Sequence, residues 1–481
     1  MRALNMHIRA VLLTESDMNE IHFSLNGAMR QVSSLGPVVT LLDHLRLAER
    51  LTATKEGCAE GDCGACTVAI GQLDEDGQIA FRAVNSCLML THELDGKLVV
   101  TTEALAKAPS LHQVQELMVE RHASQCGFCT PGFVMSLFAY EQSPATRPAL
   151  HEMLAGNLCR CTGYRPIIDA AHDIAARPQS LLPAHWAASV AALPDACINA
   201  AAPADLDELD RALHNTPSAK LLAGGTDLGV AIAKYGADPG PLISLRNLAA
   251  LREVKLSEDA LMIGAAASYS TLLPFLERLF PAFAAMVRRI GSLQIRNVAS
   301  MGGNLCNASP IGDSAPCLIA LDAILTLRSI HGVREVQAGD FFAGYRKTIL
   351  REGEYLWRIR IPLLAPAQSF HTYKLAKRYE QDISTVSAAF RLTRDNDRLI
   401  DVRAAFGGMA ATPVRARAIE AALVGGRHEP AALLSAIDED FTPLSDFRGS
   451  ADYRRQASCG ILQKLLAQQE QSLSVEDVWQ L

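Results

Sequence analysis

Long apolar runs are missing from this chain, and their absence excludes several classes of protein. No window approaches about 18 uninterrupted apolar residues, so no segment is predicted to cross a membrane. Acidic and basic residues are interspersed and give a net charge of −7, which leaves no basic patch for nucleic acid. Neither G-x-G-x-x-G nor G-x4-G-K-[ST] occurs, so neither a Rossmann nor a Walker nucleotide site is expected.

The chain also lacks a convincing export signal. Met1–Leu13 contains a short apolar run with no cleavage site after it, and the first strand-like pattern begins near Ile21–Leu25. We interpret the start as an extension, with Met18 as an alternative first residue. Twelve cysteines without an export signal indicate a reducing compartment, and we expect a cytoplasmic protein. With 481 residues, 49% of them hydrophobic, the chain is long enough for three or four domains.

The cysteines of this chain stand in an informative pattern. Three cysteines stand as C-x4-C-x2-C and a fourth follows after 20 residues, which is the plant-type spacing for a [2Fe–2S] cluster. Gly57, Gly61 and Gly64 allow a tight loop whose N–H groups point at inorganic sulfide. A zinc site or a disulfide framework is the alternative interpretation. The four residues are Cys58, Cys63, Cys66 and Cys87.

A second cysteine set combines C-x2-C with C-x-C about 30 residues later, and alone it fits zinc as well as an iron–sulfur cluster. Thr130 and Pro131 are expected to open a helix, with Thr130 as its cap. Cys129 then lies just before a helix N-terminus, where the dipole favours a thiolate. The four residues of this set are Cys126, Cys129, Cys159 and Cys161.

In this order, the ferredoxin-type cysteines, C-G-F-C and C-R-C-T-G-Y resemble the iron–sulfur part of the molybdenum hydroxylases, the family of xanthine dehydrogenase and aldehyde oxidase. The resemblance covers roughly residues 1–165. It implies that the first set holds the [2Fe–2S] cluster nearer a flavin and the second set the cluster nearer molybdenum. Gln125 matches the family's glutamine that touches the pterin of a molybdenum cofactor on another domain or subunit, although a polar helix-cap residue is an equal interpretation.

Two glycine pairs further along the chain are suited to binding a diphosphate. Gly224-Gly225 follows a predicted strand and precedes a predicted helix, and Gly302-Gly303 lies between Ser300 and Asn304. Such turns present successive N–H groups to an anion, although most glycine pairs are ordinary turns.

Together with the run that ends at Asp313, the glycine pairs resemble the flavin-binding domain of the same family, and the segment from Lys374 to Ile383 resembles its stretch over the flavin ring. Asp313 is equally explained as a helix N-cap, and Lys377 or Arg378 as a solvated charge run. The residues implied to bind FAD are Leu222, Ala223, Gly224, Gly225, Thr226, Ser300, Gly303, Asn304, Asp313 and Lys377.

The sequence therefore predicts a multidomain α+β protein. It comprises a plant-ferredoxin-like β-grasp domain, a four-helix [2Fe–2S] domain, a Pro- and Ala-rich linker, an α+β FAD-binding domain of the molybdenum hydroxylase flavoprotein type, and a C-terminal α+β domain. The expected boundaries are 1–100, 101–170, 171–194, 195–365 and 366–481, in that order.

This layout resembles the iron–sulfur/FAD small subunit of the bacterial xanthine dehydrogenases. The resemblance implies electron transfer from hypoxanthine or xanthine, oxidised at a large molybdopterin-binding subunit, through two [2Fe–2S] clusters to FAD and then to NAD. It also implies a heterotetramer of two small and two large chains. We nominate no catalytic acid or base. The alternatives are the same role in an aldehyde or N-heterocycle hydroxylase, or an electron-carrier module without turnover.

Overall fold

The computed structural model describes most of the chain, and the suggested extension and Met18 lie outside the described residues. These are 20–33, 38–74, 76–106, 110–143, 147–194, 197–199, 201–396 and 398–471. The chain divides into two compact units: the first ends at Ala250 but also includes Gly291–Ala299, and the second holds Leu251–Ile290 and the chain from Ser300 onward. None of the helices in the described ranges is long and apolar enough to span a membrane.

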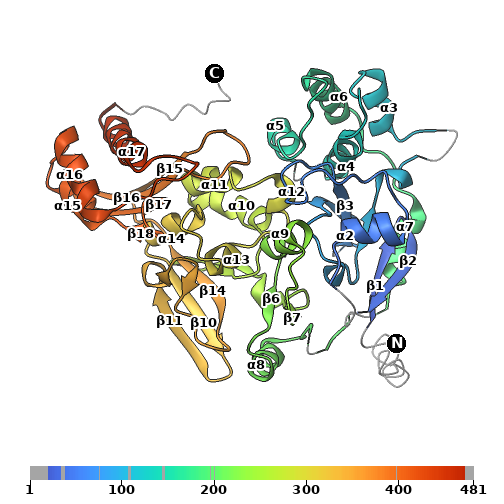
Figure 1. The fold of residues 1–481 in the computed structure, drawn as a ribbon, viewed down its shortest axis with the longest axis horizontal. Helices are drawn as coiled ribbons and strands as arrows, with labels where there is room; N and C mark the ends of the chain where they lie inside the picture. The colour runs from blue at the N-terminus through green and yellow to red at the C-terminus, as the bar shows by residue number, and fades with distance from the viewer. Residues whose placement is uncertain are drawn as a thin grey trace. The chain divides into compact units, whose positions relative to one another are not determined.

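The first unit begins with a mixed five-stranded sheet in the order β2-β1-β5-β3-β4 (Figure 1). Strand β1 pairs in parallel with β5, and the other neighbours are antiparallel. The short helix α2 (Leu41–Asp43) packs Leu41 onto this sheet beside Phe23 and Val68, which form its core. The strands are β1 (Glu20–Leu25), β2 (Ala28–Ser33), β3 (Thr67–Leu73), β4 (Ile79–Asn85) and β5 (Leu98–Val100).

A helical domain follows in the same unit. Helix α4 is apolar on nearly all sides, and it is buried from Gly132 to Ala139 because other helices and strands β3 and β4 surround it. Phe138 of α4 packs edge-on against Phe81 of β4, with 5.1 Å between ring centroids. The helices are α3 (Gln113–Glu120), α4 (Thr130–Glu141), α5 (Leu150–Leu154) and α6 (Arg165–Ala176).

The segment that we predicted as a linker, 171–194, is more ordered than expected. Helix α6 extends into it as far as Ala176, and only 177–183 and 192–194 lack helix and strand, as the prolines there predict. Helix α7 (Ala184–Ala191) then buries Trp186 against Phe81 and Phe138. Much of this segment therefore packs on the five-stranded sheet and on α4 instead of spanning a gap between domains.

The remainder of the first unit is a small βαβ element and a short inserted segment. Strands β6 (Lys220–Leu222) and β7 (Leu242–Ser244) are parallel, and helix α9 (Thr226–Tyr235) connects them. Helix α8 (Leu206–Asn215) precedes them and is capped by Asp205, whose carboxylate accepts a hydrogen bond from the N–H of Glu208.

We call the inserted segment, Gly291–Ala299, the strap; it contains helix α12 (Leu293–Arg296). Arg296 of the strap forms a buried ion pair with Glu152 of α5, with 2.6 Å between Nη2 and Oε1. The guanidinium is 1% exposed and the carboxylate 10%. The strap is therefore joined to the helical domain by charges that water hardly reaches.

The Arg296→Met variant should destabilise the first unit by about 3–5 kcal/mol, because it leaves the buried carboxylate of Glu152 without its counter-charge. Urea unfolding followed by circular dichroism measures this loss. Arg165→Met is the matched control, since Arg165 pairs with Asp169 at the surface, where ion pairs contribute little. Equal losses from both variants would contradict the assigned role of the strap.

The second unit contains an antiparallel sheet in the order β11-β10-β14-β9-β8 (Figure 1). A two-stranded ribbon of β12 and β13 follows β11 in the chain. The strands are β8 (Val254–Leu256), β9 (Ala260–Gly264), β10 (Ile324–Ser329), β11 (Gly332–Gln337), β12 (Phe342–Gly344), β13 (Lys347–Thr348) and β14 (Tyr355–Pro362). The helices of this part are α10 (Tyr269–Leu279), α11 (Pro281–Arg288), α13 (Met301–Cys306) and α14 (Ser314–Ala320).

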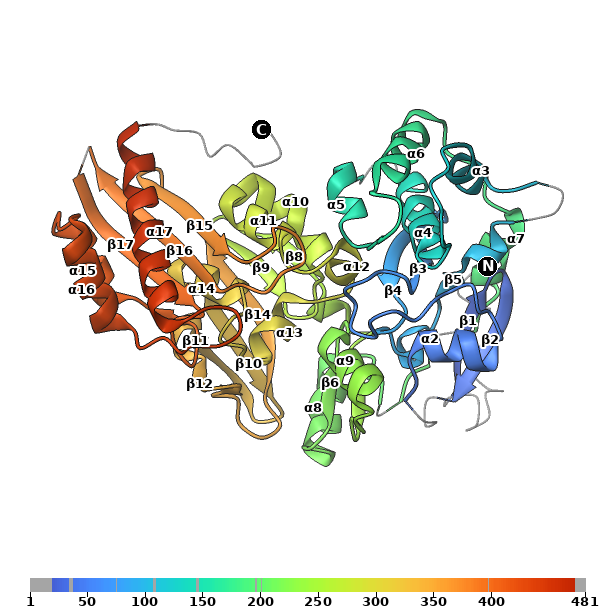
Figure 2. The same ribbon diagram turned by 45° about the horizontal axis from the view of Figure 1, so that its top comes forward.

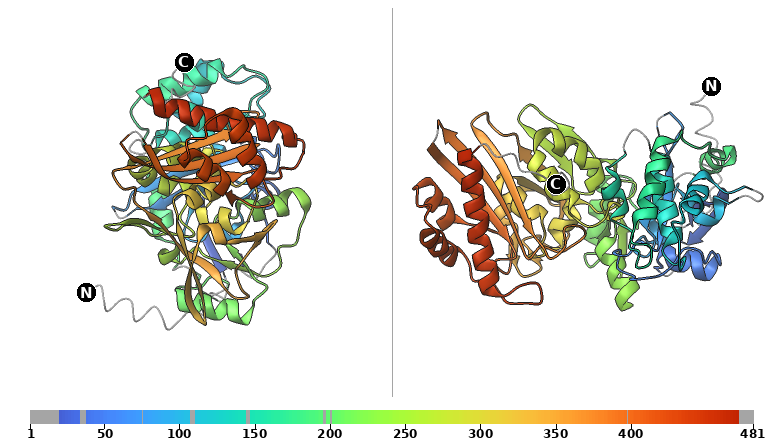
Figure 3. Two further views of the ribbon diagram at one scale, coloured as in Figure 1. Left: turned by 90° about the vertical axis from the view of Figure 1, so that its left-hand side faces the viewer. Right: turned by 90° about the horizontal axis from the view of Figure 1, so that it is seen from above.

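The second unit ends in an antiparallel sheet, β15-β16-β17-β18, with helices on both faces. One face packs Phe390 and Phe406 against α15, α16 and α17, and Figure 2 shows α17 in front of the strands. On the other face Gly407 lies against Pro316 of α14. Figure 3 shows the length of α17 along the sheet. The elements are β15 (Gln368–Leu375), β16 (Val386–Asp395), β17 (Arg398–Gly407), β18 (Val414–Arg415), α15 (Arg417–Val424), α16 (Pro430–Asp440) and α17 (Ala451–Gln471).

Candidate functional site

The loop between α2 and β3 brings Cys58 and Cys63 together. The sulfur of Cys58 accepts hydrogen bonds from the backbone N–H groups of Glu60, Asp62 and Cys63 at 3.3–3.4 Å. The side-chain hydrogen bond from Cys63, together with these N–H groups, lowers the pKa of the Cys58 thiol to about 5. The loop is therefore built to hold a thiolate, the form that binds a metal.

Cys66 and Cys87 form a second sulfur pair in the same part of the unit. Their sulfurs are 3.3 Å apart, and the amide of Asn85 lies 3.7 Å from the sulfur of Cys66. The hydrogen bond from Cys87 lowers the pKa of the Cys66 thiol, although burial acts in the opposite direction. Gly61 and Gly64 have φ of +82° and +66°, values that other residues rarely adopt, which explains the glycines of this loop.

The second cysteine set also forms two pairs. Cys126 hydrogen-bonds with Cys161, and Cys129 with Cys159. Cys126 and Cys161 are exposed, whereas Cys129 and Cys159 are partly buried. The Sγ of Cys159 lies 3.2 Å from the hydroxyl of Thr162, and the hydroxyl of Tyr164 accepts a hydrogen bond from the Cys159 N–H at 2.9 Å. The segment C-R-C-T-G-Y therefore turns back so that its last residues contact Cys159.

Helix α4 starts one residue earlier than the sequence suggested. Thr130 is its first residue and Cys129 takes the N-cap position, so Thr130 does not cap the helix as we predicted. The Thr130 hydroxyl lies 2.7 Å from that of Ser124 instead. Cys129 thus lies at the positive end of the helix dipole, where a thiolate is favoured.

This pairing bears on the choice between zinc and iron–sulfur chemistry. A [2Fe–2S] cluster places two protein thiolates on each of its two irons, so each cluster needs two pairs of sulfurs. Each cysteine set provides two pairs. Within the described residues, no three or more Cys, His, Asp and Glu side chains form a group that fits one metal ion.

The first glycine turn lies in the first unit, between β6 and α9. Gly225 has φ of +67° and takes the N-cap position of α9, so the helix begins at Thr226. A Cβ added to Gly224 would overlap the carbonyl oxygen of Val298 in the strap. Both positions therefore require glycine, and the N–H groups at the start of α9 have no helical partner of their own.

The second glycine turn lies in the second unit, at the start of α13. The Ser300 hydroxyl accepts the N–H of Gly303 at 3.1 Å and so caps this helix. A Cβ on Gly302 would overlap the backbone of Ala265, whereas a Cβ on Gly303 would meet only the Ser300 hydroxyl, at 3.0 Å. Oδ1 of Asn304 is buried without a hydrogen-bond partner among the described residues. Gly303 and Asn304 thus leave space and an acceptor that the chain itself does not use.

Asp313 and Lys377, the two charged residues implied to bind FAD, are both engaged in the second unit. Asp313 does not cap α14 with its side chain; its carboxylate accepts hydrogen bonds from Lys374 Nζ at 2.7 Å and from Ser384 Oγ at 2.5 Å. Lys377 Nζ donates to the carbonyl oxygen of Phe447 at 2.7 Å. The buried cation of this segment is therefore Lys374, which our sequence interpretation did not select.

The signal for Lys374 was present in the sequence. In a strand successive side chains alternate between two faces, and Lys374 lies on the opposite face from Tyr373, which is partly buried against the C-terminal core. Asp313, which pairs with it, is 61 residues away, and sequence spacing does not connect the two.

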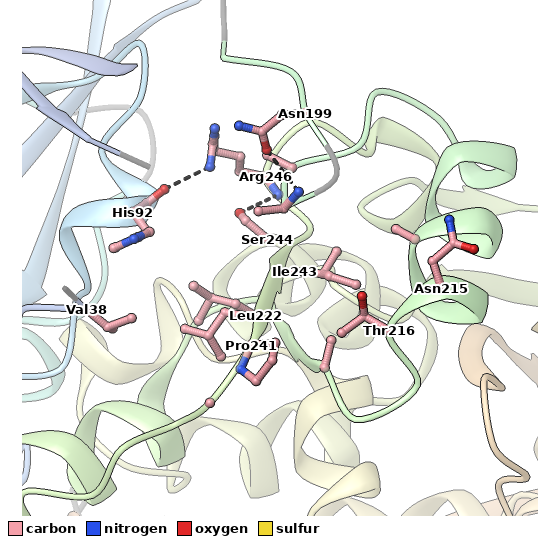
Figure 4. Close-up of a pocket in the computed structure, with 16 residues that line it drawn as sticks. Val38, His92, Asn199, Asn215, Thr216, Leu222, Pro241, Ile243, Ser244 and Arg246 are labelled. Carbon is pink, nitrogen blue, oxygen red and sulfur yellow. Dashed lines mark hydrogen bonds between the residues drawn. The ribbon is translucent and has the colours of Figure 1, made fainter. Parts of the chain in front are cut away.

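A cavity of about 350 Å³ lies beside strands β6 and β7 in the first unit (Figure 4). Leu222 and Ile243 form part of its apolar lining, and Ser244 and Arg246 lie at its polar end. Arg246 donates to the carbonyl oxygens of His92 and Cys197, both at 2.9 Å. Its guanidinium therefore joins the ferredoxin-like part to β7.

Three segments of the chain match known protein families. Residues 101–172 match a [2Fe–2S] binding domain, residues 196–364 the FAD binding domain in molybdopterin dehydrogenase, and residues 371–469 the CO dehydrogenase flavoprotein C-terminal domain. The chain therefore contains a [2Fe–2S] binding domain and an FAD-binding domain. The predicted multidomain α+β fold class is confirmed.

Xanthine dehydrogenases are among the curated relatives. The xanthine dehydrogenase of Emericella nidulans is 33% identical to this chain, over 93% of this chain and 38% of the relative. That of Oryza sativa is 30% identical, over 95% of this chain and 40% of the relative. The chain thus spans about two fifths of the length of these relatives.

Among solved structures, carbon monoxide dehydrogenase from Hydrogenophaga pseudoflava is similar at 29% identity, with a TM-score of 0.52, over 55% of this chain and 94% of that one. Quinoline 2-oxidoreductase from Pseudomonas putida 86 gives 29% identity and the same TM-score over 56% and 96%. In both cases a nearly complete chain of the other protein corresponds to little more than half of this one.

Proposed function

We propose that this chain is the electron-transfer subunit of a xanthine dehydrogenase, in which a large partner oxidises hypoxanthine or xanthine at a molybdenum cofactor. The observation that carries the proposal is the combination, in one chain, of two sets of paired cysteines with a flavin-binding domain, in an order that aligns with xanthine dehydrogenases over 93% of its length. In the carbon monoxide dehydrogenase structure, a chain that is covered to 94% corresponds to only 55% of this one, which supports the choice of xanthine dehydrogenase.

In this proposal Cys58, Cys63, Cys66 and Cys87 hold one [2Fe–2S] cluster, and Cys126, Cys129, Cys159 and Cys161 the other. When bound, these groups supply one-electron carriers between molybdenum and a flavin that passes electron pairs to NAD. The N–H groups around Cys58 and the helix dipole behind Cys129 stabilise the negative charge of the thiolates. The described cysteines form no disulfide bonds, which fits a reducing compartment, and we take this compartment to be the cytoplasm.

FAD is proposed to bind at the two glycine turns. Leu222, Ala223, Gly224, Gly225 and Thr226 offer backbone N–H groups to the diphosphate, and Ser300, Gly303 and Asn304 offer the space and the free acceptor of the second turn. Asp313 orients Lys374 through their ion pair. Lys377 keeps its proposed role near the flavin, with its ammonium held by the carbonyl of Phe447.

A second candidate is the same electron-transfer role in a hydroxylase of N-heterocycles. The similarity to quinoline 2-oxidoreductase at 29% identity favours this candidate. The two differ in the substrate that the partner oxidises. Assays of the reconstituted complex with xanthine and with quinoline separate them.

The isolated chain, loaded with iron and FAD, should oxidise NADH with an artificial dye and should not oxidise xanthine. Adding the large molybdenum-bearing partner, in a proposed assembly of two small and two large chains, should produce xanthine-dependent NAD reduction. Xanthine oxidation by the chain alone, with molybdenum shown to be absent, would contradict the division of labour.

Gln125 provides a sharper test of that division. It is exposed beside Cys126, so Gln125→Ala should slow xanthine-dependent NAD reduction and leave NADH-to-dye activity unchanged. Gln78→Ala, at another exposed glutamine, is the control for both assays. Equal coupled activity in the two variants would show that Gln125 does not face the partner's cofactor.

A further inference from the structure

The strap, Gly291–Ala299, contacts both domains that carry cysteine pairs, although in sequence it lies within the FAD-binding match at 196–364. Leu293 packs on the core of the helical domain, and Val298 on the core of the ferredoxin-like sheet. Ile295, between them in sequence, packs against the buried cluster that contains Cys66 and Cys87. One short segment therefore lies against both candidate cluster sites.

Gln294 is a polar side chain of the strap that is only 1% exposed and bonds to elements next to the second cysteine set. Its Nε2 donates to Ser136 Oγ at 3.1 Å and to Asn157 Oδ1 at 3.0 Å. Ser136 lies on α4, the helix that Cys129 precedes, and Asn157 is two residues before Cys159. Gln294 thus fixes two of the elements that present the second set of sulfurs.

The same network reaches the first cysteine set. Nδ2 of Asn157 donates to the carbonyl oxygen of Gly64 at 3.0 Å, in the loop between Cys63 and Cys66. The next residue, Leu158, donates its N–H to the carbonyl oxygen of Cys63 at 2.9 Å. The two loops that carry the cysteine sets are therefore in direct contact, and Asn157 lies between Gln294 and that contact.

Three glycines make this approach possible. A Cβ on Gly64 would overlap the carbonyl oxygen of Gly156, a Cβ on Gly132 would overlap that of Gly64, and a Cβ on Gly156 would overlap the amide of Gln294. The orientation of the Gln294 amide is also determined. The reverse orientation would set Oε1 against Oδ1 of Asn157, two acceptors facing each other.

The glutamine is a costly choice at this position. Its Oε1 is buried without a hydrogen-bond partner among the described residues, and such an acceptor loses its hydration without compensation. Methionine, of similar size, would fill the space without that loss. The directional bonds of Nε2 are what an apolar side chain cannot provide.

We propose that Gln294 is a positioning residue that sets the distance and orientation between the two clusters, and thereby the rate of electron transfer between them. This inference rests on the proposed function, because it requires both [2Fe–2S] clusters to be present. Gln294 does not touch the clusters itself; it acts through Ser136 and Asn157.

The test is Gln294→Met in the full chain loaded with iron and FAD. We expect full iron and flavin content and both reduced centres in electron paramagnetic resonance, but a changed magnetic interaction between the centres and a several-fold slower electron transfer between them. Gln142→Met is the matched control: Gln142 is buried at the other end of α4 and bonds to Ser180. It should leave the interaction as in the parent chain.

Ser136→Ala provides the same test with a smaller change of volume, in case Gln294→Met does not fold. An unchanged magnetic interaction and transfer rate in either variant, with full iron content, would overturn the inference. So would a parent chain whose two reduced centres show no interaction. A parent chain without two iron centres would instead overturn the proposed function, and this inference with it.

Discussion

The Cys63→Ser variant should lose one of two paramagnetic centres and keep the other. The parent chain should hold about four irons and four sulfides, because eight thiolates complete two [2Fe–2S] sets. Serine cannot replace the soft thiolate that pairs with Cys58, so about two irons should remain. Cys129→Ser should remove the other centre and keep the first. Iron analysis and electron paramagnetic resonance after reduction measure both effects.

Cys459→Ser is the control, since Cys459 is a cysteine of helix α17 in the C-terminal part and belongs to neither set. It should keep both signals and all the iron. Loss of both signals from Cys63→Ser alone, in a chain that is still folded, would indicate one shared cluster. Zinc in place of iron in the parent chain would contradict the assignment of both sets.

The Gly303→Val variant should lose FAD and retain its iron. Among the described residues, an added Cβ at position 303 would meet only the Ser300 hydroxyl, at 3.0 Å, and no backbone atom. It would occupy the space in which we place the diphosphate. The flavin absorbance near about 450 nm should therefore disappear from the purified protein.

Gly460→Val is matched to this change, because Gly460 is also a helical glycine of the second unit and an added Cβ there meets nothing within 4 Å. It should bind FAD as the parent chain does. Full flavin absorbance in Gly303→Val would show that the diphosphate does not lie against this turn.

Local patterns in the sequence predict the secondary structure around Cys129 and around Gly225, since a helix start or a tight turn depends on residues close together in the chain. The helix after Cys129 and the turn at Gly225 lie within a residue of the predicted positions. The burial of Trp186 was not predictable from composition, because the prolines near it mark a break in helix and say nothing of what the next helix packs on.

Longer-range pairs were also beyond the sequence patterns. Lys374 and Asp313 are brought together by two separate elements, so neither reveals the other by spacing. Gln294 bonds to Asn157 across 137 positions. Its neighbours in sequence give it the appearance of an ordinary polar helix residue, and only the tertiary fold shows that it is buried.

The strap also has a consequence for how a gene for this chain can be divided. If the gene were divided at the predicted linker, 171–194, the upstream polypeptide would contain both cysteine sets. It would lack the strap, which would belong to the downstream polypeptide. Ser136 and Asn157 would lose the amide donor of Gln294, and Glu152 would keep a carboxylate without Arg296. A natural or engineered fission would therefore need compensating substitutions at these positions in the shorter polypeptide.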